Sequence, residues 1–349
     1  MADTNSVASP AGGPHNRVTV LGGGAWGTAL AKLLADKGDH VTLWCRRGEL
    51  ARDINQSRTN DKYLPGAPLP TTLLATDDLA AAVASAGMLV FVAPSHATRD
   101  VARAAAPHLR EGVPIVSATK GIENDSLMFV DEILEAELPA FARSALAFLS
   151  GPSFAKELAG ELPTGVVIAS KNESVRTEVM RRFHTGHLRT YGSDDVVGVE
   201  CGGALKNVIA IAAGAADGLG FGYNTRAMLI TRGLAEIARL ATARGGHALT
   251  LAGLAGMGDL VLTCTGELSR NRRVGIELGQ GKKLAEILRD LGHVAEGVKT
   301  AKSAFDLSHK LGVDMPITRE TYAVLYEDKP VKQALRDLMS RALGPEFKP

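Results

Sequence analysis

The chain has 349 residues, of which 45% are hydrophobic, so it holds enough apolar material for a buried core. At about 150 residues per domain, this length predicts about two domains. Lysine and arginine number 39, and aspartate and glutamate 38, so the formal net charge is only +1. This balance provides no basic field for nucleic-acid binding, and the interspersed charges are not typical of a disordered scaffold. We therefore expect no nucleic-acid partner.

The three cysteines, Cys45, Cys201 and Cys264, are far apart in the sequence. They lack C-x-x-C spacing, so neither a disulfide framework nor a metal site is expected, and reduced thiols in a cytosol fit best. No apolar run approaches the ~18 residues that span a bilayer. The longest, at residues 208–216, is interrupted by Gly214, so the sequence predicts no transmembrane helix.

The N-terminal half alternates between short apolar runs and helical segments. Residues 17–21 form a β-rich run, followed by a glycine cluster and an alanine- and leucine-rich helix to about Lys37. Further strands are predicted at residues 40–45, 88–93, 114–117, 146–149, 165–169 and 188–191. Such alternation predicts an α/β fold with a mostly parallel sheet and helices on both faces, as in a Rossmann domain.

From about Glu200 the strand signals fade, and long stretches carry a 3.6-residue apolar period. Glycine clusters divide this half into several helices, which predicts an all-α C-terminal domain. We expect a flexible tail at 1–16, since it lacks secretory-signal features. The dinucleotide-binding Rossmann domain is expected at 17–198, the helical substrate-binding domain at 199–344, and a frayed tail at 345–349.

The glycines Gly22-x-Gly24-x-x-Gly27 lie between a predicted strand and a predicted helix. In that context Gly22 permits a tight turn, Gly24 lets the backbone approach a pyrophosphate, and Gly27 allows close helix–strand packing. The helix N-terminus adds N–H groups and a positive dipole. A glycine-rich turn that binds nothing is the alternative. We predict a dinucleotide site.

The end of the second predicted strand reads Leu43-Trp44-Cys45-Arg46-Arg47, with no acid before Glu49. An acid at this place accepts hydrogen bonds from a ribose 2′-hydroxyl, whereas an arginine accommodates a 2′-phosphate. Arg46 and Arg47 therefore favour NADPH over NADH. The alternative is that both arginines are merely solvated.

Lys206 has Gly202, Gly203, Ile209 and Ala210 as its helical neighbours, so it emerges from an apolar, small-residue face. Burial and a nearby cation would lower its pKa and suit it to proton transfer near neutral pH. A lysine reaching solvent at the helix edge is the alternative.

Three further polar positions have open alternatives. Lys120 follows a short strand, where it either binds a phosphate or carbonyl or is an ordinary loop lysine. Asp259 either binds a substrate hydroxyl, orients a lysine, or caps the following helix. Ser269 is an expected N-cap, and Arg270 is either a phosphate ligand or a surface charge.

These residues carry a resemblance to the bacterial-type NAD(P)-dependent glycerol-3-phosphate dehydrogenases. It extends from Val18 to about Leu343, through the segments GGGAWGTAL, NDKYLP, APSH, SATKGIE, GPSFAKE, CGGALKNVIAI, GMGDLVLTCT, SRN and VAEG. GPSFAKE combined with GGALKNV and GDLVLTCT is specific to this family. Ala25 departs from the family's usual Ser, and the tail before Arg17 is longer than usual.

The resemblance implies a role for individual residues. Lys206 would be the catalytic proton donor or acceptor. The substrate would be held by Lys120, Gly151, Ser153, Lys206, Asp259, Ser269, Arg270 and Asn271. The cofactor would contact Ala25, Trp26, Arg46, Lys120, Ala155, Val294 and Glu296, and Arg270 would be shared between substrate and cofactor. These add to the glycine turn and Arg47, which the residues themselves indicate.

The resemblance also implies the reaction, which is reduction of dihydroxyacetone phosphate to sn-glycerol 3-phosphate with NADPH, NADH being possible. It implies a cytoplasmic homodimer that supplies glycerophospholipid synthesis. The nearest rival is a two-domain dehydrogenase acting on a 3-hydroxy acid such as 6-phosphogluconate. A nucleotide-sensing regulatory protein without turnover is a rival of another class, although a sensor needs no proton donor.

Overall fold

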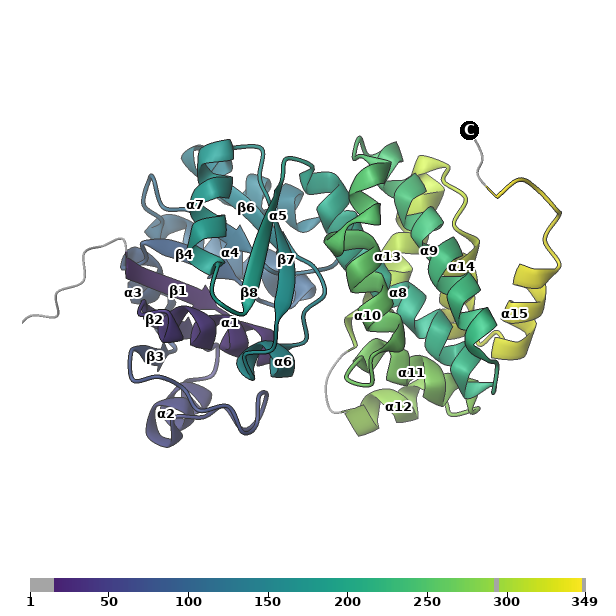
Figure 1. The fold of residues 1–349 in the computed structure, drawn as a ribbon, viewed down its shortest axis with the longest axis horizontal. Coiled ribbons are helices and arrows are strands. Elements are labelled where there is room, and N and C mark those ends of the chain that lie inside the picture. The colour runs from purple at the N-terminus through teal and green to yellow at the C-terminus, as the bar shows by residue number, and fades with distance from the viewer. Residues whose placement is uncertain (1–15, 292–294, 347–349) are drawn as a thin grey trace, which may run out of the picture.

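A computed structural model describes residues 16–291 and 295–346. Figure 1 shows a sheet covered by helices in one half of the molecule and a bundle of helices in the other. This arrangement confirms the α/β fold with a C-terminal helical part.

One sheet of eight strands has the order β3-β2-β1-β4-β5-β6-β7-β8. The strands are β1 (Arg17–Leu21), β2 (His40–Trp44), β3 (Leu73–Thr76), β4 (Met88–Phe91), β5 (Ile115–Ser117), β6 (Leu146–Ser150), β7 (Thr164–Ala169) and β8 (Leu188–Ser193). All neighbouring pairs are parallel except β6 with β7. Seven of these strands were expected from the sequence, and β3 was missed because its Leu-Leu-Ala-Thr run is short and nearly free of β-branched residues.

Helices cover both faces of the sheet, and most central strand residues are buried. These helices are α1 (Ala25–Asp36), α2 (Gly48–Ser57), α3 (Leu79–Ala84), α4 (Thr98–Ala105), α5 (Val130–Glu137), α6 (Ala155–Ala159) and α7 (Glu173–Phe183). The chain runs from β1 outward to β3 and then returns to β4 on the other side of β1. In parallel sheets, ligands bind outside the carboxyl ends of the strands at such a reversal.

The second half is built around the 23-residue helix α8 (Val196–Gly218). It packs against α9 (Tyr223–Ala243), α10 (Asp259–Thr265), α11 (Arg270–Gly279) and α13 (Glu296–Leu311). The remaining helices are α12 (Leu284–Leu291), α14 (Pro316–Tyr326) and α15 (Val331–Met339). Asp195 caps the start of α8 by accepting a hydrogen bond of 2.8 Å from the Gly198 N–H.

Helix α8 corrects one sequence expectation, because it is long and apolar enough to cross a membrane by length and composition. Gly214 does not interrupt the apolar run, because the helix continues through it. Gly214 is needed there, since a Cβ would lie 2.1 Å from the Arg272 carbonyl oxygen. In the structure, 89% of the most apolar window of α8 is buried inside the protein, as in a core helix.

Candidate active site

The glycine turn after β1 has the geometry that its sequence predicts. Gly22 has φ +133°, and a Cβ there would lie 2.7 Å from the Val92 carbonyl oxygen, beyond β4. A Cβ on Gly27 would lie 1.9 Å from the Gly22 carbonyl oxygen, so this glycine permits helix α1 to pack against the turn. At Gly24, by contrast, a Cβ would meet no atom within 4 Å. The turn thus leaves open space at Gly24, where α1 begins.

The cap residue Gly24 has no side chain, so no side-chain cap satisfies the N–H groups of the first turn of α1. Ala25 and Trp26 are the first two residues of the helix, and the lack of a Ser hydroxyl at Ala25 leaves the backbone donors unchanged. The Asn60 side-chain amide stabilises the turn. It donates a hydrogen bond of 3.0 Å to the Gly23 carbonyl and one of 2.7 Å to the Thr28 hydroxyl. Sequence reasoning assigned no role to Asn60, although it starts the quoted NDKYLP segment.

Arg46 and Arg47 are both exposed after β2. Arg47 donates a hydrogen bond of 2.6 Å to the Tyr63 hydroxyl, so it is not merely solvated. A carboxylate also lies beside them, because a Cβ on Gly48 would be 2.2 Å from Asp77 Oδ2. Asp77 directly follows β3, a strand that the sequence pattern does not predict, so the sequence gives no signal for this acid.

Lys120, Lys206 and Asp259 come together from three distant segments. Asp259 Oδ1 accepts a hydrogen bond from the Lys206 ammonium, and Asp259 Oδ2 accepts one of 2.8 Å from Lys120 Nζ. Asp259 is 1% exposed and Lys206 is 9% exposed, so neither side chain extends into solvent. Of the alternatives left open, the structure favours Asp259 orienting the lysines and rejects Lys206 reaching solvent.

Small residues allow this meeting. A Cβ on Gly202 would lie 2.3 Å from the Ala255 carbonyl oxygen, in the π-helical turn Leu254–Gly258 that precedes α10. A Cβ on Gly203 would lie 3.5 Å from the stem of Lys120. The glycines before Lys206 therefore let both the Asp259 segment and Lys120 approach α8. π-helical turns of this kind occur frequently at functional sites.

Burial and charge shift the pKa values of this cluster. Burial lowers the pKa of Lys206 to about 8, although Asp259 opposes the shift, and the neighbouring Lys120 adds to it. For Asp259 burial acts to raise the pKa, but the ammonium groups of Lys120 and Lys206 outweigh burial and hold it below its usual value. A pKa of about 8 suits Lys206 to proton transfer near neutral pH, beside a carboxylate whose lowered pKa favours its ionised form.

Gly151 and Ser153 lie beside Lys120. The Gly151 carbonyl oxygen accepts hydrogen bonds from Lys120 Nζ at 3.3 Å and from the Ser153 hydroxyl at 2.9 Å. Gly151 has φ +137°, a conformation that favours glycine. The segment after β6 thus contacts Lys120 through the Gly151 carbonyl.

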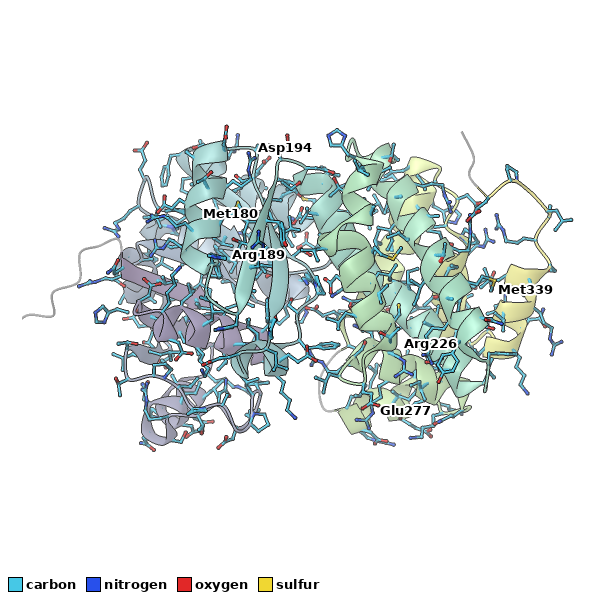
Figure 2. The ribbon with its side chains drawn as sticks, viewed as in Figure 1. Met180, Arg189, Asp194, Arg226, Glu277 and Met339 are labelled. Atoms are coloured by element: carbon cyan, nitrogen blue, oxygen red, sulfur yellow. The ribbon has the colours of Figure 1, made fainter. Side chains whose placement is uncertain are left out.

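The start of α11 confirms the N-cap expected at Ser269. Its hydroxyl accepts a hydrogen bond of 3.2 Å from the Arg272 N–H. Arg272 pairs with Asp217 at 2.7 Å, as does Arg226, which is labelled in Figure 2. Of the residues described, none forms an ion pair with the exposed Arg270.

The side-chain amide of Asn271 joins three helices. Its Nδ2 donates a hydrogen bond of 2.9 Å to Asn207 Oδ1 on α8, and its Oδ1 accepts one of 3.0 Å from the Gly297 N–H on α13. In this structure the Asn271 side chain thus links α11 to both α8 and α13 by hydrogen bonds.

Glu296, the first residue of α13, faces the same cluster. Burial raises its pKa, while Arg270, Lys206, Lys120 and a hydrogen bond with the Ser95 backbone oppose the rise. Ala155 begins α6, which packs against α1. Val294 lies outside the described residues.

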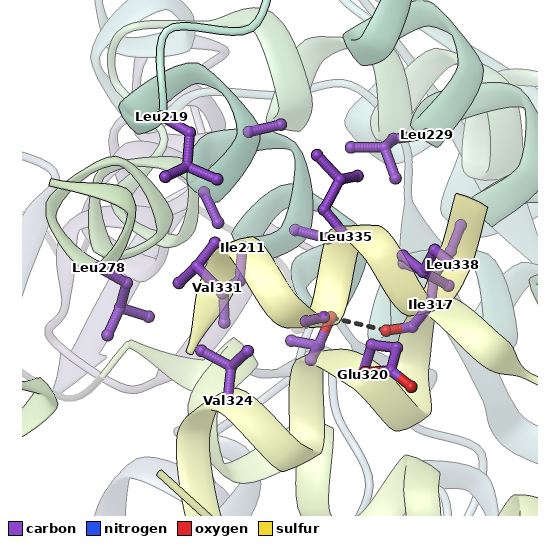
Figure 3. Close-up of a pocket in the computed structure, with 15 residues that line it drawn as sticks. Ile211, Leu219, Leu229, Leu278, Ile317, Glu320, Val324, Val331, Leu335 and Leu338 are labelled. Atoms are coloured by element: carbon purple, nitrogen blue, oxygen red, sulfur yellow. Dashed lines mark hydrogen bonds between the residues drawn. The ribbon is translucent and has the colours of Figure 1, made fainter. Parts of the chain in front are cut away.

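The helical half also contains an apolar cavity, which lies away from these polar groups. Figure 3 shows it between α8, α14 and α15. Within α14, which lines it, the Thr321 hydroxyl donates a hydrogen bond of 2.8 Å to the Ile317 carbonyl. Its lining offers no acid–base pair of the kind found around Asp259. Within 16–291 and 295–346, no three His, Cys, Asp or Glu side chains are grouped to hold a metal ion.

Comparisons with known proteins agree with this arrangement. Residues 17–176 match the family model for the N-terminus of NAD-dependent glycerol-3-phosphate dehydrogenase, and residues 195–336 match that for its C-terminus. A protein of Geobacter metallireducens named glycerol-3-phosphate dehydrogenase (NAD(P)+) is 55% identical over 325 residues, which is 93% of this chain and 97% of the relative. A Leptospira biflexa protein of the same name is 54% identical over 330 residues, covering 95% of this chain and 99% of the relative.

The crystal structure of glycerol-3-phosphate dehydrogenase from Coxiella burnetii superimposes with a TM-score of 0.89 at 40% identity, covering 93% of this chain and 99% of that one. Neither a 3-hydroxy-acid dehydrogenase nor a nucleotide sensor accounts for two family models that together span most of the chain. The chain belongs to the NAD-dependent glycerol-3-phosphate dehydrogenase family.

Proposed function

We propose that this protein interconverts dihydroxyacetone phosphate and sn-glycerol 3-phosphate by hydride transfer with NADPH, and with NADH at lower efficiency. The observation that carries the proposal is the buried Lys206–Asp259–Lys120 cluster, in which Lys206 would be the proton donor, beside the segment that follows β5. Curated relatives with over 50% identity are named for this dehydrogenase activity with NAD(P)+.

The cofactor fits the residues at the reversal of the sheet. The open space at Gly24 and the free N–H groups of Ala25 and Trp26 suit a pyrophosphate. Arg46 and Arg47 suit a 2′-phosphate, while Asp77 offers an acceptor to a ribose hydroxyl, which is consistent with the use of both cofactors. Lys120, Ala155, Arg270, Val294 and Glu296 would complete the cofactor contacts.

The substrate would lie among cations. Lys120, Lys206 and Arg270 face the carboxyl groups of Asp259 and Glu296, so the cluster retains net positive charge for a phosphate ester. We assign the phosphate to the start of α11, where Arg270 has no other ion pair among the described residues. Gly151, Ser153, Ser269 and Asn271 would shape the remaining contacts, and the last two also keep α11 in place.

The acid–base chemistry belongs to Lys206. When bound, NADPH supplies the hydride that reduces the C2 carbonyl. The protonated Lys206 ammonium donates its proton to the carbonyl oxygen, and in the reverse direction neutral Lys206 accepts the hydroxyl proton. Lys120 and Lys206 stabilise negative charge that develops on that oxygen, and Asp259 keeps the two ammonium groups oriented.

Absorbance loss of NADPH, and separately of NADH, with dihydroxyacetone phosphate tests this proposal. Unphosphorylated dihydroxyacetone is the matched control for the phosphate contact. We expect turnover with the phosphorylated ketone and little with the control. Absence of turnover with both cofactors would reject the reaction, and equal turnover of both ketones would reject the assignment of Arg270.

We further propose the division of the chain at residue 198, with cofactor-binding residues at 17–198 and substrate-binding residues at 199–344. We also propose that the protein is a cytoplasmic homodimer whose product feeds glycerophospholipid synthesis. Sedimentation at several protein concentrations tests the dimer, which predicts twice the mass of one 36.6 kDa chain.

A further inference from the structure

A small polar cavity lies behind Lys120, between strands β5 and β6 and helix α8. It is lined by Ser117, Thr119, Lys120, Gly121, Phe148, Leu149, Ser150, Val199, Glu200 and Gly203. About 10 Å³ of it is open to the centre of a water molecule. By this measure, one buried water needs roughly 10–15 Å³ and two to four polar partners. The cavity therefore has the size for a single water.

The Ser150 hydroxyl is the first polar group in this cavity. Ser150 is 4% exposed, and its Oγ has no hydrogen-bond partner among the described residues. A Cβ on Gly203 would lie 2.7 Å from that Oγ, so the glycine preserves the space between the hydroxyl and α8. A buried hydroxyl without a partner destabilises the folded state, and buried waters commonly satisfy such groups.

The Glu200 carboxyl is the second polar group. Its two oxygens accept hydrogen bonds from the Asp131 N–H at 3.2 and 3.4 Å. Burial and the Asp131 carboxyl raise the pKa of Glu200 well above its usual value, while Arg244 opposes the rise. The charges of Asp131 on α5 and Arg244 at the end of α9 act on it, Cys201 on α8 is coupled to it, and Lys120 lines the same cavity.

Lys120 connects the cavity to the active site. Its stem lies over Gly203 at the cavity wall, and its ammonium contacts Asp259 Oδ2 at 2.8 Å. The charge of the same Lys120 ammonium lowers the pKa of Lys206. The Lys120 side chain is thus shared between the wall of the cavity and the active site.

We propose that this cavity binds one ordered water through the Ser150 hydroxyl and the Glu200 carboxyl, and that Ser150 and Glu200 are positioning residues that hold Lys120 beside Asp259. The proposal rests on the proposed function only in treating Lys120 as part of the site. Sequence reasoning assigned no role to either residue, since a satisfied buried hydroxyl and an unsatisfied one look alike in a sequence.

Three substitutions test the positioning role. Glu200→Met keeps the length of the side chain and removes its polar atoms, Ser150→Ala removes the hydroxyl, and Glu200→Gln keeps groups that bind a water. Ser170→Ala is the matched control, because it removes a buried hydroxyl that is already satisfied by the Leu146 carbonyl at 2.6 Å in the same sheet.

We expect Glu200→Met and Ser150→Ala to lower kcat about 3- to 10-fold, equivalent to roughly 1 kcal/mol. Both variants should move the midpoint of the pH profile of ketone reduction upward, since a displaced Lys120 depresses the pKa of Lys206 less. Glu200→Gln should restore the midpoint, and Ser170→Ala should not move it. A loss of stability alone would leave the midpoint in place, and that result would overturn the positioning role.

Crystallography provides a readout that does not depend on turnover. We expect a density peak within hydrogen-bond distance of Ser150 Oγ and the Glu200 carboxyl in the unmodified protein and in Glu200→Gln, and none in Glu200→Met. An empty cavity in the unmodified protein would overturn the water site. If the unmodified protein lacked turnover, the proposed function would fail while this density still decided the water site.

Discussion

Lys206 and Asp259 are 53 residues apart in the chain, yet the ammonium of one donates a hydrogen bond to the carboxylate of the other in the buried centre of the molecule. Removing a charged pair from water is costly unless both members remain paired and hydrogen-bonded. Asp259 meets this condition, because it also accepts a hydrogen bond from the Lys120 ammonium. Its two oxygens thus hold two cations in one site.

The pH dependence of the reaction should report the pKa of Lys206. Because reduction requires the protonated ammonium, kcat/KM for dihydroxyacetone phosphate should be level below about pH 8 and fall above it. The oxidation of glycerol 3-phosphate should rise over the same range. Initial rates in both directions from pH 6 to 10 measure this, and Lys206→Ala should lose roughly 10²- to 10⁴-fold in kcat.

Replacing Asp259 by Asn provides the companion measurement. The carboxylate raises the pKa of Lys206, so its loss should move the reduction profile to lower pH. A profile that stayed in place would show that the carboxylate does not set the charge of the lysine.

Two glycines of the same turn should respond differently to an added methyl group. Gly27→Ala would place a Cβ 1.9 Å from backbone, so it should destabilise the fold by several kcal/mol. Gly24→Ala meets nothing within 4 Å and has an ordinary φ of −78°, so it should remain folded while binding NADPH at least 10-fold more weakly. Thermal unfolding and cofactor titration separate the two effects. Unchanged NADPH affinity in Gly24→Ala would contradict the pyrophosphate site.

Cofactor preference should depend on the arginines after β2. Arg46→Ala should lower kcat/KM for NADPH about 10- to 100-fold, since a hydrogen bond to a charged group contributes about 1.5–3 kcal/mol, and it should leave NADH nearly unaffected. Arg47→Ala should have a similar but smaller effect, because part of its role is the bond to Tyr63. The ratio of the two kcat/KM values measures the preference, and an unchanged ratio in both variants would mean that neither arginine contacts the phosphate.

Stability should fall as Glu236 loses its proton in the folded protein. Burial raises the pKa of Glu236 to about 7, against hydrogen bonds from the backbone of Ile317 and Thr318. Since its pKa in the unfolded chain lies near 4.5, the folded state binds more protons between these values. Its contribution is therefore complete below about pH 4.5 and lost as the pH rises through about 7.

The matched variant for this titration is Glu236→Gln, which keeps an acceptor for α14 and removes the proton equilibrium. Between pH 5 and 8, the unfolding free energy of the unmodified protein should decline relative to the variant by roughly 1–3 kcal/mol. Chemical unfolding at several pH values measures the difference. Parallel curves for the two proteins would show that Glu236 stays ionised throughout.

The sequence by itself determined the features that depend on neighbouring residues in the chain. The run of strand, glycines and helix around Gly22 and Gly27 predicts its own turn, because backbone conformation and close packing act within a few residues. The small-residue face around Lys206 likewise follows from helical spacing, and the N-cap at Ser269 from its place before a helix. The resemblance of the motifs was sufficient for the family.

Only the tertiary structure decided how distant groups are paired. The sequence left Asp259 as a ligand, a cap or an orienting group, and its contacts with Lys120 and Lys206 favour the last. It gave no sign that Asp77 lies beside Gly48, because the short strand β3 forms only by pairing with β2. Burial, hydrogen-bond satisfaction and pKa shifts depend on atoms from segments far apart in the chain, and folding alone brings these atoms together.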